Sequence, residues 1–188
     1  GFESTYGLDY QAREGKSTYA WREAGGSEEE DVFGLYLQND VDLGKYFETS
    51  FGVRFDYYEF TDISGQDFDS DHFSPNGSLT FKPIEDLAIT GGYAAAYRGV
   101  GIREAFLPGV YAPGTDGEDA ETIKGTVAYD NGSFFASGSV FTQSIEDYLY
   151  PTGAAGSFGD IESDGYEFKV GYRHDGFHAS IKIGRAHV

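Results

Sequence analysis

The chain has 188 residues, which is enough for one domain or two small ones. It contains no cysteine, which excludes disulfide bonds and thiolate metal sites, and its net charge of −19 argues against nucleic-acid binding, which needs a basic surface. Aromatic residues make up 17% of the sequence and argue against the disorder that so high a charge would otherwise suggest.

Apolar and polar residues alternate in successive segments along the chain. In the third segment, for example, Phe51 and Val53 alternate with Arg54 and Asp56. Successive side chains of a strand point to opposite faces, so this alternation predicts strands with one apolar face and one charged face. Nine such segments follow one another, at residues 3–11, 32–43, 46–60, 73–82, 87–98, 121–129, 133–150, 161–174 and 177–182.

The connections between these segments alternate between long polar stretches and short turns. The Asn131-Gly132 and Asp175-Gly176 pairs are strong signals for tight hairpin turns. Long strands with loops sorted in this way are typical of outer-membrane barrels, in which the apolar face meets lipid and the polar face lines a wet interior. The sequence therefore predicts an all-β fold: an antiparallel transmembrane β-barrel fragment, with about nine up-and-down strands in an open curved sheet.

Both ends of the sequence bear on the domain organisation. The chain starts with Gly1 and contains no methionine, and we interpret it as an internal piece of a longer gene. Residues 183–188 match the translation of a common sequencing adapter, and we interpret them as a processing scar that should be excluded from the fold. Residues 1–182 are then the barrel segment.

An acidic run gives the one candidate metal site. Asp67, Asp69 and Asp71 have the spacing of the first three ligands of an EF-hand loop, but His72 stands where that loop needs glycine and Ser78 where it needs glutamate. We interpret the run as solvated loop charge, with calcium binding as the alternative. No cofactor is predicted, and no catalytic motif was found.

Five segments resemble motifs of the barrel domain of TonB-dependent outer-membrane receptors, and they occur along the chain in the same order as in that family. Residues 73–83 read FSPNGSLTFKP and are similar to the family pattern F-S-P-x-x-G-L-x-Y-K-P. Val100 departs from the family, which has proline there, and this bears on the receptor subclass. The other segments are residues 34–41, 51–57, 93–106 and 163–167.

This resemblance implies a function for the whole protein. It would be a bacterial outer-membrane receptor, not an enzyme, that imports a scarce small-molecule ligand such as an iron–siderophore complex. Its partners would be the outer-membrane lipid and the TonB complex, which acts through a plug domain missing from this chain. Nucleic acid is not an expected partner.

The ligand is expected at the loop side of the barrel, because binding residues concentrate in long loops on a rigid scaffold. An anionic siderophore would meet rim arginines first. The candidate residues are Arg98, Arg103, Phe106 and Tyr111. Two alternatives remain open: another outer-membrane barrel, such as a porin or autotransporter translocator, and a secreted soluble β-sandwich that binds calcium or glycans.

Overall fold

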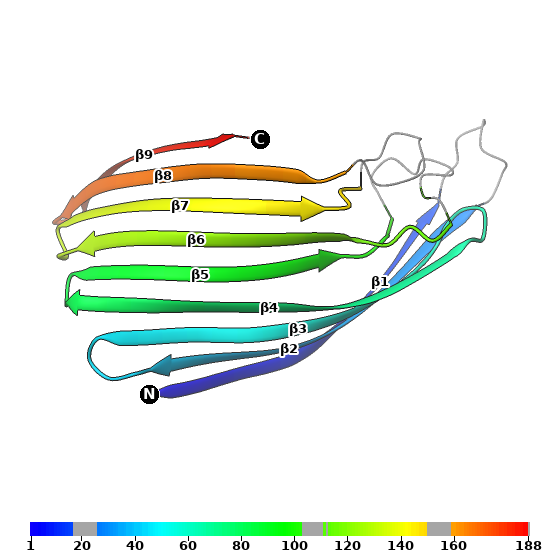
Figure 1. Ribbon diagram of the computed structural model, residues 1–188, viewed down its shortest axis with the longest axis horizontal. Helices are drawn as coiled ribbons and strands as arrows, with labels where there is room; N and C mark the ends of the chain where they lie inside the picture. The colour runs from blue at the N-terminus through cyan, green and yellow to red at the C-terminus, as the bar shows by residue number, and fades with distance from the viewer. Residues whose placement is uncertain (17–25, 103–110, 112, 150–158, 188) are drawn as a thin grey trace.

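The computed structural model describes residues 1–16, 26–102, 111, 113–149 and 159–187. Within them, nine strands form a single antiparallel sheet in chain order (Figure 1). The strands are β1 (Phe2–Lys16), β2 (Ser27–Asp42), β3 (Phe47–Thr61), β4 (Asp67–Ile84), β5 (Leu87–Arg98), β6 (Glu118–Asp130), β7 (Phe134–Glu146), β8 (Ile161–His174) and β9 (Phe177–His187). No helix among the described residues is long and apolar enough to cross a membrane.

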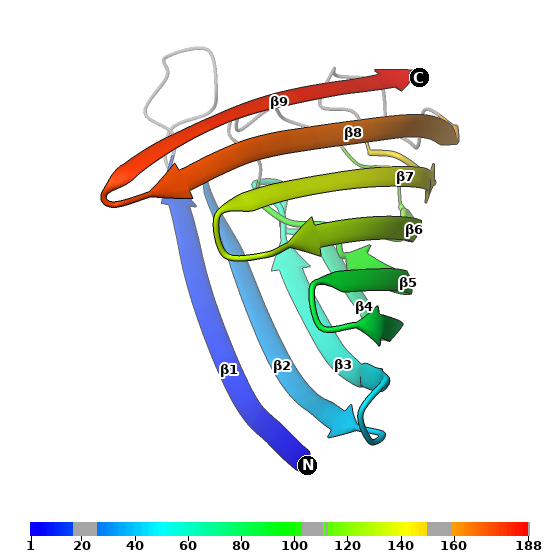
Figure 2. The ribbon, with the colours of Figure 1, turned by 90° about the vertical axis from the view of Figure 1, so that its left-hand side faces the viewer.

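The sheet is curved and open, with β1 and β9 at its two edges (Figure 2). The described residues contain no second sheet packed against it, which excludes the β-sandwich alternative for this part of the chain. The connections 43–46, 85–86, 131–133 and 175–176 lie at one end, called here the turn end. The other connections, 17–26, 62–66, 99–117 and 147–160, begin and end at the opposite end, called here the loop end.

The two tightest predicted turns are confirmed, and their backbone explains their sequence. Gly132 has φ of 90°, and Asp175 and Gly176 have φ of 44° and 81°. These left-handed conformations are favourable for glycine and tolerable for aspartate or asparagine. Asn131 also accepts hydrogen bonds from the backbone N–H groups of Ser133 and Phe134, at 3.1 and 2.8 Å.

The predicted separation of apolar and polar faces is confirmed by the register. Tyr6 lies opposite Leu37, and Leu37 lies opposite Val53, so the three side chains form one apolar row across β1, β2 and β3. Residues directly opposite each other share a face of the sheet. The same logic places Ile89 and Val127 in one row on the same face.

The apolar face is exposed over the whole width of the sheet. Leu8 is 71% exposed on the edge strand β1, Ile89 is 43% exposed on the central strand β5, and Ile181 is 66% exposed on the edge strand β9. A contiguous apolar surface of this extent is abnormal for a soluble monomer and fits contact with lipid.

We therefore expect the isolated 188-residue chain to aggregate in detergent-free buffer and to remain dispersed in detergent, because only detergent covers this face. Light scattering with and without detergent measures the difference. A soluble monomer in detergent-free buffer would contradict a lipid-facing role for this face.

Five strands, β1, β2, β4, β6 and β9, are longer than the sequence predicts, and β9 continues to His187 through residues that we interpret from the sequence as a processing scar. β4 begins at Asp67 and not at residue 73, so the acidic run that the sequence predicts to be a loop is part of a strand. It pairs with β3 up to Thr61, which extends the β3–β4 hairpin toward the loop end. β1 and β2 also extend past their predicted bounds, to Lys16 and from Ser27.

The ladder between β4 and β5 ends early. Its last pair toward the loop end is Asn76 with Ala94, although both strands continue beyond it. Pro75 is the next residue of β4, and it has no N–H group to donate to a neighbouring strand. Beyond this point β1–β4 diverge from β5 (Figure 1).

Side chains bridge the region where β4 and β5 are not paired. The ring of His72 stacks on that of Tyr97, with 4.6 Å between the ring centroids. His72 Nε2 lies 3.1 Å from Asp119 on β6, and the hydroxyl of Tyr58 donates a hydrogen bond of 3.3 Å to the Tyr97 carbonyl. These contacts close the wall where the backbone ladder is missing.

Candidate ligand-binding site

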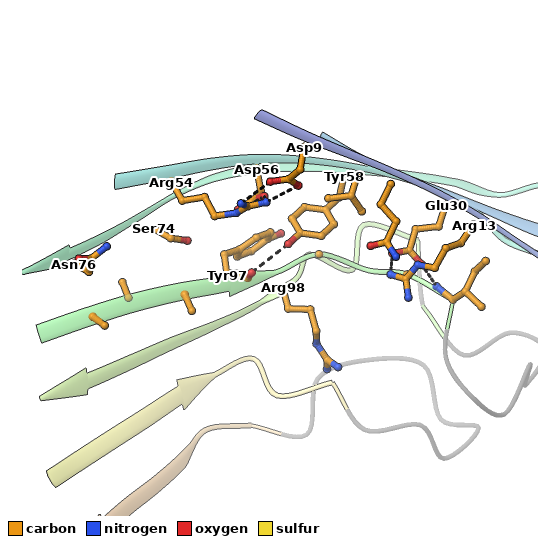
Figure 3. Close-up of a pocket in the computed structure, with 18 residues that line it drawn as sticks. Asp9, Arg13, Glu30, Arg54, Asp56, Tyr58, Ser74, Asn76, Tyr97 and Arg98 are labelled. Atoms are coloured by element: carbon orange, nitrogen blue, oxygen red, sulfur yellow. Dashed lines mark hydrogen bonds and ion pairs between the residues drawn. The ribbon is translucent and has the colours of Figure 1, made fainter. Parts of the chain in front are cut away.

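A cavity of about 800 Å³ lies on the polar face, next to the point where β4 and β5 diverge (Figure 3). Residues of β1–β5 and of the connection after β5 line it, which means that the polar face is concave here. Its volume is within the usual range of small-molecule sites. The polar side chains in its lining are Asp9, Gln11, Arg13, Glu30, Arg54, Asp56, Tyr58, Ser74, Asn76, Tyr97 and Arg98.

Arg54 on β3 binds two carboxylates, Asp56 on its own strand and Asp9 on β1, and so connects β3 to β1 across β2. Its Nη1 and Nη2 atoms donate to the two oxygens of Asp9 at 2.8 and 3.0 Å, a bidentate geometry that suits a guanidinium. Its Nε atom donates to Asp56 at 2.7–2.8 Å. Asp56 is only 4% exposed, so Arg54 compensates a buried negative charge.

Gly34 makes room for this arrangement. It lies on β2 directly between Asp9 and Asp56 in the register. A Cβ atom at this position would lie 2.1 Å from Arg54 Nη2, which is too close for any real contact. The absence of a side chain on β2 therefore lets the guanidinium cross from β3 to β1.

A second arginine, Arg13, pairs with Glu30 on the neighbouring strand. Glu30 is 3% exposed, because the chain that follows β5 covers it. Its Oε2 atom accepts a hydrogen bond of 2.8 Å from the backbone N–H of Ile102. A Cβ atom on Gly101 would come within 2.8–3.0 Å of the Glu30 carboxylate, so glycine allows this close approach.

The third arginine, Arg98, was predicted from the sequence as a ligand-binding residue. It lies in the cavity lining at the end of β5, and its side chain is 49% exposed. Its Nη2 atom lies 2.7 Å from Glu118 Oε2. The same carboxylate oxygen accepts a hydrogen bond of 3.0 Å from the backbone N–H of Leu149.

Tyr111, another predicted ligand-binding residue, is buried in a hydrophobic cluster at the loop end. It is 9% exposed, and its hydroxyl donates a hydrogen bond of 3.2 Å to the carbonyl of Gly101. This placement gives it a packing role and leaves little surface for a ligand. The cluster consists of Phe60, Phe68, Val100, Tyr111 and Leu149.

The other predicted residues are placed as follows. Arg103 and Phe106 lie outside the described residues, so their role remains a prediction. Asp67, Asp69 and Asp71 lie at alternate positions on one face of β4, opposite residues of β3, and not in an EF-hand-like loop. The described residues contain no group of three or more His, Asp or Glu side chains placed to hold a metal ion.

Sequence reasoning missed most of the cavity lining. Asp9, Arg13 and Glu30 come from segments that are adjacent only through the β1–β2 register. Tyr58 and Ser74 come from β3 and β4. Their alternation with apolar residues indicated a polar face, but no local motif indicated which part of that face is concave.

The cavity can bind a polar ligand of mixed charge. Each of its three arginines has a carboxylate partner, and hydroxyl and amide groups of Tyr58, Ser74 and Asn76 lie beside them. Guanidinium groups recognise carboxylate and phosphate oxygens in a bidentate way, whereas the hydroxyl and amide groups can donate or accept.

Comparison with known proteins gives a family for the chain. Residues 1–184 match the family described as TonB dependent receptor-like, beta-barrel. No curated protein sequence matches the chain.

Three solved structures illustrate the similarity of fold. The FrpB iron transporter (F3-3 variant) of Neisseria meningitidis has a TM-score of 0.85 at 22% identity, over 98% of this chain and 32% of that protein. The ferric yersiniabactin uptake receptor FyuA of Yersinia pestis has a TM-score of 0.69 at 15% identity, over 86% and 27%. The siderophore receptor PiuA of Acinetobacter baumannii has a TM-score of 0.66 at 18% identity, over 85% and 26%.

The chain thus spans about a third or less of the length of these receptors, and at these identities they show the fold alone. The family match, which covers nearly the whole chain, decides between the barrel types that the sequence left open. Its members are transporters and not enzymes. The chain belongs to the TonB-dependent receptor β-barrel family.

Proposed function

We propose that the intact protein is a receptor of the bacterial outer membrane that imports a scarce small-molecule ligand, with an iron–siderophore complex as the first candidate. The observation that carries this proposal is the charged cavity of about 800 Å³ on the concave face at the loop end of the sheet. A closed version of this sheet would have lipid on its apolar face and the cavity in its interior.

The names of the three similar structures described above support iron as the transported element. They are an iron transporter, a ferric yersiniabactin uptake receptor and a siderophore receptor. The arginines Arg13, Arg54 and Arg98 supply the donors that the carboxylate or other anionic oxygens of such a ligand need. The TonB complex, acting through a plug domain encoded outside this chain, is the proposed energy source.

The general test is growth of a host strain under iron limitation. Deletion of the complete gene should abolish growth on at least one member of a panel of ferric siderophores, and deletion of TonB should have the same effect. Growth that survives loss of TonB would favour passive diffusion through a porin-like pore.

The sharper test replaces arginines at the loop end. Arg98→Gln with Arg103→Gln should reduce uptake by about tenfold or more at low ligand concentration, since each hydrogen bond to a charged group contributes about 1.5–3 kcal/mol. Glutamine at position 98 keeps a hydrogen-bond donor for Glu118, although it removes the counter-charge of that carboxylate. Uptake of labelled iron measures the loss.

The matched control is Lys82→Gln, which removes a polar-face cation from an ion pair with Glu48 near the turn end. It should leave uptake unchanged. Both variants should show the heat-modifiable gel mobility of an assembled barrel. Equal uptake by the arginine variant and the parent would remove these arginines from the binding site.

A further inference from the structure

Two carboxylates at the loop end repeat the same arrangement of contacts. Glu30 joins Arg13 to the backbone N–H of Ile102, and Glu118 joins Arg98 to the backbone N–H of Leu149. In each case a cavity arginine, a carboxylate and a loop backbone form a continuous chain of charge-assisted contacts. The two loops begin at positions far apart in the sequence, on either side of β6 and β7.

Burial makes these contacts strong. Glu30 is 3% exposed, and the Glu118 side chain is 14% exposed. A buried carboxylate needs both a counter-charge and hydrogen-bond donors, and loss of either leaves an uncompensated charge. The arginine supplies the first and the loop N–H supplies the second, so neither the loop nor the arginine can move alone at low cost.

The hydrophobic cluster lies beside these contacts and binds the same two loops. Val100 is 3% exposed and Leu149 is 2% exposed, and both belong to the cluster that contains Phe60 of β3 and Phe68 of β4. Apolar packing holds the loops against the sheet but does not specify one position, because it is not directional. The hydrogen bonds to the two carboxylates are directional, and they fix the position of each loop backbone.

We propose that Glu30 and Glu118 are positioning residues, which fix the first residues after β5 and β7 to the cavity arginines and so set the shape of the cavity mouth. The expected effect of this anchoring on ligand uptake rests on the proposed receptor function. The anchoring itself is independent of what the receptor transports, and it is tested without a ligand.

The test uses the intact receptor in the outer membrane of cells, with Val100→Cys as a reporter. Valine and cysteine are similar in size, and this chain has no other thiol. In the parent, the buried thiol should react slowly with a membrane-impermeant maleimide. Glu30→Ala should speed labelling about tenfold or more, because the loop loses a charge-assisted hydrogen bond.

Two further variants separate positioning from general damage. Glu30→Gln keeps an oxygen that can accept from Ile102 and should label at nearly the parent rate. Glu30→Leu fills the same volume without an acceptor and should label as fast as Glu30→Ala; it also serves if the alanine variant does not assemble. Glu48→Ala, at the turn end, is the control and should not change labelling.

The outcomes distinguish the two proposals. Slow labelling of assembled Glu30→Leu, or equally fast labelling of Glu48→Ala, would overturn the positioning role. If Glu30→Leu labels fast but takes up ferric siderophores at the parent rate, then Glu30 does position the loop, but this positioning does not matter for transport. Absence of uptake in the parent itself would overturn the proposed function and leave the anchoring result intact.

Discussion

Val53→Arg should destabilise the intact barrel by about 2–4 kcal/mol, provided that Val53 faces the bilayer core. Val53 is 39% exposed on the apolar face and lies between Leu37 and Pro75 in the register. An arginine there would bring a charge into the hydrocarbon layer. Denaturant titration of the receptor in lipid vesicles, followed by heat-modifiable gel mobility, measures the change.

Gln38→Arg is the matched control for this prediction. Gln38 pairs with Gly52, the neighbour of Val53, so it lies at the same height in the wall but on the opposite face. It donates a hydrogen bond of 2.7 Å to Ser50, and an arginine could replace that contact while its charge stays in the wet interior. We expect little change, and equal destabilisation by the two substitutions would contradict the assignment of faces.

The faces of the sheet were predictable because alternation is a local property of the sequence. Phe51, Val53 and Phe55 share one face whatever the partner strand, and the Asp175-Gly176 turn fixes the β8–β9 pairing within a few residues. The order of the strands followed because each hairpin joins neighbours in the sequence. These local signals were enough for the architecture.

The strand ends were less predictable because the residues there are mostly polar, so apolar and polar residues no longer alternate. Asp67, Asp69 and Asp71 read as a loop, yet pairing with β3 keeps them extended. The early end of the β4–β5 ladder was also missed. Pro75 is visible in the sequence, but its effect depends on which neighbouring strand its missing N–H would have faced.

The cavity was the least predictable feature because it depends on this divergence of strands. Arg98 was identified from its place at the end of a strand, and the structure puts it in the lining. Tyr111 was expected to face a ligand, but packing against Phe60 and Phe68 buries it. Glu30 carried no sequence signal, since its burial results from the fold of a loop that starts about seventy residues later.

The structure also changes the expected effect of replacing Arg54. From the sequence, Arg54 is one of several polar-face charges, and Arg54→Gln would be mild. In the structure it compensates Asp56, which is 4% exposed, and it binds Asp9 on β1, the strand beyond its neighbour β2. Removing one partner of a buried ion pair leaves the other charge uncompensated.

We therefore expect Arg54→Gln to destabilise the receptor by about 3 kcal/mol, the low end for a buried pair, because the Arg54 side chain is itself 37% exposed and screened by water. Adding Asp56→Asn should recover much of this loss, since it removes the buried charge. Arg173→Gln breaks an exposed pair with Asp130 near the turn end and should change stability little. Denaturant titration of the four proteins would distinguish these cases. If Arg54→Gln and Arg173→Gln have equal effects, or Asp56→Asn gives no recovery, then the charge of Arg54 does not compensate Asp56 or hold β3 to β1.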